Sequence, residues 1–175
     1  LDLQVEHGND LRWYTVVGND RPAELAYVVD HPAVLMGFSD AGAHLRNMAY
    51  YDFPLHLLRL VKRSTDAGSP VMTVERAVHR LTGEIADYLG IDAGRLEIGR
   101  RADIAVIDPA RLDDRLDDIH ETEMVGMAGL QRLVRRHDDC VPAVLVNGRV
   151  AWRDGTFVDD LGHRGGYGRV LRTAA

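Results

Sequence analysis

In residues 1–38, segments whose hydrophobic residues have helical spacing alternate with segments that are typical of strands. Residues 1–7 have the apolar spacing of the end of an amphipathic helix, and residues 22–30 predict a short helix that begins at a proline. Residues 11–17 and 34–38 are rich in β-branched, aromatic and aliphatic side chains, which favour strands. A strand, a helix and a second strand at this spacing predict a βαβ unit with parallel strands.

Two longer helices are expected after this unit. Apolar residues recur at helical intervals in residues 53–62 and again in residues 74–89. Thr73 is suited to cap the second of these helices, while Gly83 is suited to kink it and Gly90 to end it. These residues therefore continue the α/β pattern of the first part.

The pattern changes after Gly90, where glycines and a proline separate short β-type runs. A nearly continuous apolar run within residues 102–108 predicts a strand. Asn147-Gly148 lies between two apolar runs in residues 143–152, and Asn-Gly at such a place is a strong hairpin signal because both residues tolerate positive φ.

The segment between the strand and the hairpin, residues 110–140, is highly charged. It predicts an excursion over the surface with one short helix, and we assign it no chemistry. The chain is therefore expected to divide into an α/β part, residues 1–90, and a β part, residues 91–175.

Composition and charge exclude several classes of protein. The 175 residues are 46% hydrophobic with a formal net charge of −6, which is enough apolar material for a core and argues against a nucleic-acid partner. Cys140 is the single cysteine, so no disulfide forms within the chain. No apolar run approaches the roughly 18 to 20 residues that cross a bilayer, and residues 1–6 lack a signal-peptide pattern. We expect a cytoplasmic protein without a membrane partner.

Asp40 is the leading candidate for chemistry. It lies in a polar, glycine-containing turn directly after the apolar run of residues 34–38. A carboxylate at the end of a buried strand is held rigidly where a metal ion or a substrate can reach it. The alternative interpretation is that Asp40 only turns the chain or caps a following helix.

Residues 37–44, Gly-Phe-Ser-Asp-Ala-Gly-Ala-His, resemble the eighth-strand motif of the amidohydrolase superfamily, in its branch of N-acyl-D-amino-acid deacylases, the D-aminoacylases. Residues 94–108 are similar to the entry of that family into its β-sandwich, residues 144–151 to its closing hairpin, and residues 168–172 to the C-terminus of the D-aminoacylase branch. The order of these motifs after a strand that ends in Ser-Asp is the specific part of the resemblance.

The resemblance implies the C-terminal part of a metal-dependent hydrolase. Residues 1–90 would supply the last strands and helices of a (β/α)8 barrel, and residues 91–175 the C-terminal part of a small β-sandwich domain. Such a barrel alone takes about 250 residues. The eight histidines include no His-x-His pair, so the other ligands of the family's metal site would lie upstream. We therefore expect an inactive fragment that holds no stoichiometric zinc.

The resemblance also implies roles for three residues. Asp40 would touch a zinc ion or its bound water, accept the proton of that water and pass it to the departing amine. His44 and Arg46 follow on the same loop and would face the substrate, with Arg46 pairing with the carboxylate of an N-acyl amino acid. Contacts of His44 and Arg46 with backbone or solvent are the alternative.

The substrate class stays open at this point. Ala41 replaces a glycine of the D-aminoacylase motif, and a cyclic amide or imide hydrolase of the same superfamily is the second candidate. A non-catalytic α/β module that binds another protein is the third. Because the expected strands at residues 11–17 and 34–38 would lack neighbours in this chain, we expect it to self-associate.

Overall fold

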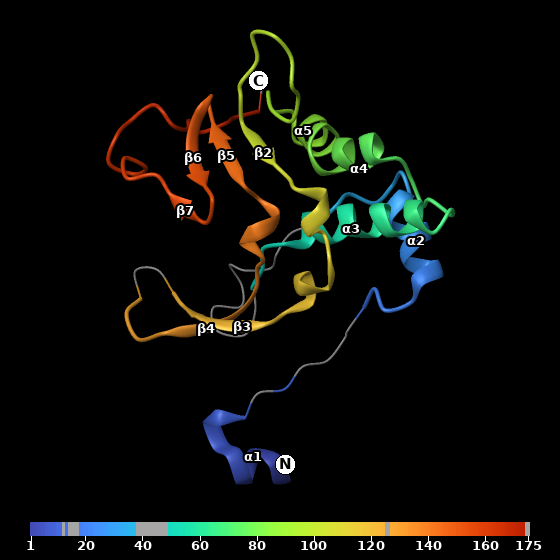
Figure 1. The fold of residues 1–175 in the computed structure, drawn as a ribbon, viewed down its shortest axis with the longest axis vertical. Coiled ribbons are helices and arrows are strands. Elements are labelled where there is room, and N and C mark those ends of the chain that lie inside the picture. The colour runs from blue at the N-terminus through green and yellow to red at the C-terminus, as the bar shows by residue number, and fades with distance from the viewer. Residues whose placement is uncertain (12, 14–17, 38–48, 125–126, 174–175) are drawn as a thin grey trace. The chain divides into compact units, whose positions relative to one another are not determined.

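The computed structural model describes residues 1–11, 13, 18–37, 49–124 and 127–173. These residues fall into two compact units, Leu1–Val34 and Leu35–Ala175 (Figure 1). The division expected near Ile91 stays a prediction.

The smaller unit, Leu1–Val34, contains short helices. They are α1 (Asp2–His7), the 3-10 helix η1 (Gly8–Asp10) and α2 (Pro22–Asp30). The bounds of α2 are those predicted from the sequence, with Pro22 in its first turn, where the missing N–H costs nothing. The strand predicted for residues 11–17 falls mostly outside the described residues.

The larger unit, Leu35–Ala175, combines helices with two sheets. Its helices are α3 (Phe53–Asp66), α4 (Val74–Leu81), α5 (Gly83–Leu89), and the 3-10 helices η2 (Pro109–Arg111), η3 (Asp114–Asp117) and η4 (Asp138–Cys140). Its strands are β1 (Ala49–Tyr50), β2 (Ile104–Val106), β3 (His120–Glu123), β4 (Gln131–Arg135), β5 (Ala143–Val146), β6 (Arg149–Arg153) and β7 (Thr156–Phe157).

The helices begin and end largely where their caps predict. Thr73 Oγ1 accepts a hydrogen bond from the backbone N–H of Arg76 at 3.2 Å and so caps α4. The predicted kink lies at Thr82, between α4 and α5, and Gly90 ends α5 in the left-handed conformation with φ of 63°. Helix α3 continues to Asp66, four residues beyond its predicted end.

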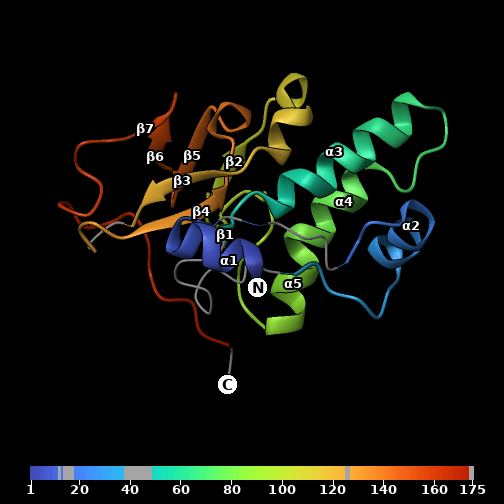
Figure 2. The same ribbon diagram turned by 90° about the horizontal axis from the view of Figure 1, so that it is seen from below.

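The two sheets have different topologies. The first has the order β1-β4-β3, with β1 parallel and β3 antiparallel to β4. The second is antiparallel and has the order β2-β5-β6-β7 (Figure 2). Asn147 and Gly148 form the predicted turn between β5 and β6, with φ of 52° and 78°. The described residues thus include a single parallel pair, β1 with β4, and the (β/α)8 barrel stays a proposal.

Two sequence-based expectations were wrong. Val34 to Gly37 form no strand, although an apolar run favours one, because a strand is stabilised by a paired neighbour and no described segment pairs with these residues. Leu133 and Val134, which suggested the short helix in the charged segment, lie in strand β4, and Leu130 directly precedes that strand. The exposure of β4 alternates, with Arg132 and Val134 buried, which is the period of a strand.

One hydrophobic cluster of the described residues joins α3 to the charged segment that follows β2. Its buried members are Leu55 from α3, Leu112 and Leu116 from the segment, and Cys140 from η4. Leu116 and Cys140 are fully excluded from solvent. The segment that the sequence assigns to a surface excursion therefore supplies part of the core.

Replacing Gly94 by alanine is expected to destabilise the larger unit by about 2 kcal/mol. A Cβ at this position would lie 2.7 Å from the backbone carbon and oxygen of Thr82, and Gly94 has a φ of 74°. Gly68 has nearly the same φ, 75°, but open space around its Cβ position, so Gly68→Ala isolates the conformational contribution. Urea unfolding of both variants measures the difference, and equal losses would contradict the contact with Thr82.

Candidate functional site

The three residues singled out from the sequence lie in a gap of the description. Asp40, His44 and Arg46 all fall within residues 38–48, outside the described residues. Their catalytic and substrate-binding roles stay predictions. The binding of zinc and of an N-acyl amino acid by the protein also stays a prediction. The described residues that follow this segment begin with β1 and lead directly into a polar network on α3.

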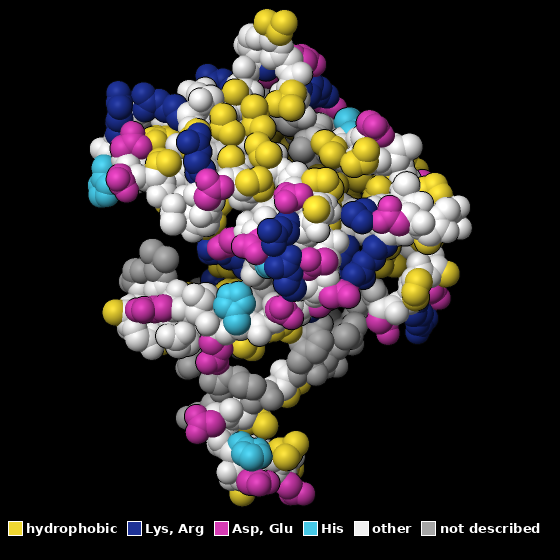
Figure 3. All heavy atoms as spheres, viewed as in Figure 1, with side chains coloured by type: hydrophobic (Ala, Val, Ile, Leu, Met, Phe, Trp, Pro, Cys, Tyr) yellow, Lys and Arg dark blue, Asp and Glu magenta, His cyan; other side chains and the backbone are white. Residues whose placement is uncertain are grey.

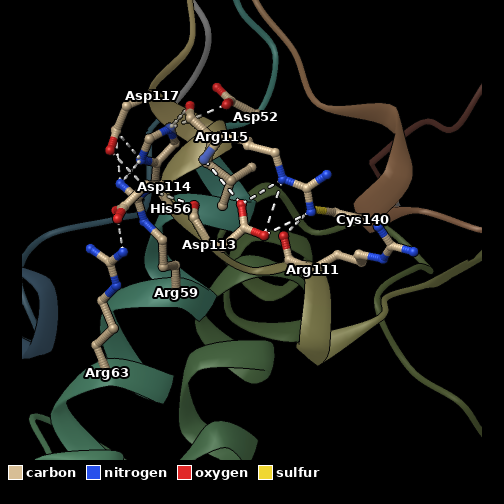
Figure 4. A network of polar contacts seen from close by, with 11 residues as sticks. Asp52, His56, Arg59, Arg63, Arg111, Asp113, Asp114, Arg115, Asp117 and Cys140 are labelled. Atoms are coloured by element: carbon tan, nitrogen blue, oxygen red, sulfur yellow. Dashed lines mark hydrogen bonds and ion pairs between the residues drawn. The ribbon is translucent and has the colours of Figure 1, made fainter.

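Four polar side chains follow one face of α3. Asp52 precedes the helix, and His56, Arg59 and Arg63 follow at intervals of four, three and four residues, which places them in one stripe. This stripe faces the aspartates of η3 and the residue before it (Figure 4). The stripe and η3 together are called the α3 network below.

Arg59 is the centre of the α3 network. Its guanidinium makes two parallel hydrogen bonds of 2.8 Å to the carboxylate of Asp117 and a third of 2.9 Å to the backbone oxygen of Asp113. Only 10% of the Arg59 side chain is exposed, whereas 52% of the Asp117 side chain is. The hydrogen bonds that Arg59 donates to Asp117 raise the pKa of Arg59 and lower the pKa of Asp117.

The neighbours of His56 determine its tautomer. Nη2 of Arg59 lies 3.2 Å from Nδ1 of His56 and can only donate, so Nδ1 is the acceptor. Nε2 then carries the hydrogen, and it lies 3.0 Å from the backbone oxygen of Leu116 and 3.2 Å from Oδ2 of Asp52. Both ring nitrogens of His56 are therefore occupied within the network.

The network is suited to holding α3 against η3 and not to catalysis. Both terminal nitrogens of Arg59 and both ring nitrogens of His56 have protein partners, and Arg63 pairs with the exposed Asp114. Cys140, beside the network, is buried and donates its S–H to the backbone oxygen of Arg111, and burial raises the pKa of its thiol to about 11. Such a thiol is a poor nucleophile at neutral pH.

Asp52 differs from the other members of the network because it is only half satisfied. Its side chain is 2% exposed, and Oδ2 is bonded to His56. Oδ1 is buried and has no hydrogen-bond partner in the described part of the chain. Asp52 also lines a largely apolar cavity of about 410 Å³ between the start of α3 and the sheet β2-β5-β6-β7. The sequence offered one signal for this residue, an aspartate just before a helix that begins Phe-Pro.

A second hollow, of about 430 Å³, lies beside β3 and β4. Its lining mixes charges of both signs with apolar groups, including His120, Glu123 and Arg132. Arg132 donates to the hydroxyl of Tyr51 at 2.9 Å. Across the described ranges, no three histidine, cysteine, aspartate or glutamate side chains are grouped to hold a metal ion, so the zinc site that the resemblance implies would need Asp40 and residues from elsewhere.

Replacing Arg59 by alanine is expected to destabilise the larger unit by about 2 kcal/mol, less than for a fully buried pair because Asp117 is half exposed. The loss leaves Asp117 and the Asp113 carbonyl without their donor. Arg63→Ala is the matched control one turn later, and its exposed pair with Asp114 predicts a loss of no more than about 0.5 kcal/mol. Urea unfolding measures the stability of both variants. A larger loss for Arg63→Ala than for Arg59→Ala would contradict the assignment of Arg59 as the centre of the network.

The same pair predicts an acid dependence. Because the hydrogen bond from Arg59 lowers the pKa of Asp117 in the folded state, the unfolded state binds a proton more readily. The stabilisation is therefore complete above the unfolded aspartate pKa of about 3.9 and is lost as the pH falls through the lower folded value. Free energies of unfolding measured from pH 6 down to about pH 2 should fall less steeply in Arg59→Ala than in the wild type.

Comparison with known proteins finds relatives for the whole chain and for a part of it. Uncharacterized proteins of Mycobacterium tuberculosis and Mycobacterium bovis are 48% identical over 174 residues, which is 99% of this chain and 28% of each relative. The chain thus spans about 28% of the length of these relatives. No family model and no solved structure matches it.

Dihydroorotases match a shorter segment. The enzyme of Bacillus cereus is 45% identical over 56 residues, which is 32% of this chain and 12% of that enzyme, and the enzyme of Bacillus thuringiensis is 43% identical over the same length. About a third of the chain is therefore similar in sequence to proteins named dihydroorotase. Among the described residues, no helix has the length and apolar character to cross a membrane.

Proposed function

We propose that this chain is the C-terminal part of a longer metal-dependent amidohydrolase that cleaves the amide bond of N-acyl-D-amino acids or related amides. The single observation that supports an amidohydrolase is the similarity to dihydroorotases over 56 residues, while the choice of N-acyl-D-amino acids rests on the motif of residues 37–44. The mycobacterial relatives are 48% identical to this chain, which covers only 28% of their length. This difference in length supports the part of the proposal that assigns the chain to a longer protein. The chain alone is proposed to be inactive.

Asp40 is the residue of this chain that we propose as the acid and base of the reaction. The proposal rests on its place in the motif of residues 37–44 and on the chemistry of a carboxylate, which exchanges protons with water and with a departing amine. His44 and Arg46 are proposed to face the substrate. Arg59, by contrast, is occupied by Asp117 and takes no part.

A cyclic amide or imide hydrolase is the second candidate. The similarity to dihydroorotases favours it, because those relatives carry an enzyme name and the mycobacterial relatives carry none. Both candidates use the same proposed residue and differ only in the substrate.

The experiment uses the longer protein, purified with zinc in the medium. Its zinc content is measured, and hydrolysis is assayed with a panel of N-acetyl-D-amino acids, their L-enantiomers and cyclic amides such as dihydroorotate and hydantoin. Turnover of one class that is lost with a chelator and restored with zinc is the expected result. A protein that holds zinc but hydrolyses neither class, or one that binds no zinc and captures a protein partner instead, would overturn the proposal in favour of a non-catalytic module.

A further inference from the structure

Hydrophobic side chains gather on the surface of the larger unit over β2 and α5 (Figure 3). These two elements and the loop between them contain five large apolar residues with high exposure, Tyr88, Leu89, Leu96, Ile98 and Val106. The five residues are called the 88–106 surface below. Single exposed hydrophobic residues are normal on a protein, whereas a group of them is typical of an interaction site.

The loop between α5 and β2 carries ion pairs on both sides of its apolar residues. Arg95 donates hydrogen bonds of 2.7 and 2.6 Å to the carboxylate of Asp87 on α5. Arg100 binds two acidic residues of the same loop. Between these two arginines, Leu96 is 75% exposed and Ile98 is fully exposed. Because a preorganised surface loses less conformational entropy on binding, such a loop is suited to contact a partner.

Strand β2 forms an open edge of its sheet. β5 pairs with one side of β2 in a regular register, and no described strand pairs with the other side. Ile104, Ala105 and Val106 carry no charge, and the last two are exposed. Native sheets protect their edges with charges, prolines, bulges or a covering segment. Since β2 has no charge, no proline and no bulge, a covering segment is the protection that fits it.

The length of the relatives indicates where such a segment comes from. The match of 174 residues makes up 28% of each mycobacterial relative, so nearly three quarters of each relative lies outside it. A segment of the same polypeptide reaches its site at an effective concentration of about millimolar when the linker is short and flexible. A second copy binds only at the concentration of the protein in solution. The same polypeptide is therefore favoured over a second copy.

We propose that the 88–106 surface is the docking site for another part of the longer polypeptide to which this chain belongs. The docked part presents an apolar face to Leu96, Ile98 and Val106, and it shields the open edge of β2. The inference rests on the proposed function for one premise, that the chain belongs to a longer protein. It uses neither zinc nor Asp40.

Hydrogen exchange of backbone amides, followed by mass spectrometry, tests the docking. Peptides that cover residues 88–106 are compared between the 175-residue chain and the longer protein, each at a low and a high concentration. We expect exchange to be at least about tenfold slower in the longer protein at both concentrations, because covered amides open less often. Residues 112–117, whose leucines are already buried within this chain, are the internal reference and should change less than about twofold.

Variants assign the protection to the apolar contact. Ile98→Asp places a charge within it and should speed the exchange of residues 88–106 at least about tenfold in the longer protein. In the 175-residue chain, where Ile98 is fully exposed, the change should stay below about twofold. Val170→Asp is the matched control, since Val170 is 80% exposed and lies outside the 88–106 surface, and it should change neither protein. If Ile98→Asp prevents the longer protein from folding, Ile98→Ala should give an acceleration of about fivefold.

Three results would overturn the proposal. Equal exchange in the chain and in the longer protein would show that the surface stays open. Slowing that appears only at the higher concentration would assign the surface to a second copy, which light scattering would detect as a dimer. Equal slowing of residues 88–106 and of the reference would indicate general stabilisation without a contact. A longer protein that protects the surface but hydrolyses no substrate of the panel would contradict the proposed function alone.

Discussion

Replacing Asp40 by asparagine in the longer protein is expected to lower kcat about 10³-fold, within the range that a positioned general acid and base contributes. Asparagine keeps the size of the side chain and an oxygen, but it cannot take up a proton at neutral pH. If Asp40 moves the proton between water and the departing amine, the substitution removes that path and leaves the binding of the substrate largely intact. The expected result is therefore a fall in kcat with a KM that changes much less.

The control for this experiment is another aspartate of a turn. Asp20 lies in the Gly-Asn-Asp sequence after residues 11–17 and is exposed, so Asp20→Asn should leave kcat and KM unchanged. Initial rates are measured with the best substrate of the panel, together with zinc content and circular dichroism. A folded Asp40→Asn protein that retains zinc and the kcat of the wild type would show that Asp40 is only a turn residue.

Local signals in the sequence predicted local structure well. Helix α2 has its predicted bounds because a proline begins it, and α4 begins directly after Thr73 because that side chain caps it. The β5–β6 turn follows from Asn147-Gly148, two residues that accept positive φ. In each case the determining contact spans only a few residues, so the sequence alone contains it.

Long-range pairing explains what the sequence did not reveal. Strand β4 pairs with β1, more than eighty residues earlier, and with β3 across a turn, and no local pattern names such partners. Leu130, Leu133 and Val134 fit a helical spacing as well as a strand, and the pairing decides between them. The charged character of the segment between β2 and β5 concealed Leu112 and Leu116, which are buried.

The polar network was missed for the same reason. The stripe of Asp52, His56 and Arg59 is visible in the sequence as helical spacing, but the partner of Arg59 lies 58 residues later. Charged residues on a helix usually face solvent, and only the fold shows that Arg59 is buried. That Oδ1 of Asp52 lacks a partner among the described residues could not be predicted from the sequence, since it depends on which atoms the fold brings near.

Replacing Leu116 by alanine is expected to destabilise the larger unit by about 3 kcal/mol, as for other fully buried leucines. Leu116 is fully excluded from solvent and lies in the cluster with Leu55, Leu112 and Cys140. Its backbone oxygen also accepts the hydrogen bond from His56, so the residue joins the core to the α3 network. A void at this point would loosen the packing of η3 against α3 without breaking any ion pair.

The measurement is urea unfolding of Leu116→Ala beside Leu96→Ala, because Leu96 is 75% exposed and its truncation should cost no more than about 0.5 kcal/mol. The midpoint should fall for Leu116→Ala while the slope with urea stays the same, which indicates a loss of stability and not a change in the surface exposed on unfolding. If the two variants unfold at the same urea concentration, the charged segment from η2 to η3 is a surface excursion after all, as its composition suggests. A lower urea midpoint for Leu116→Ala alone instead assigns that segment to the core. The same packing would then fix the position of Asp117, which binds Arg59.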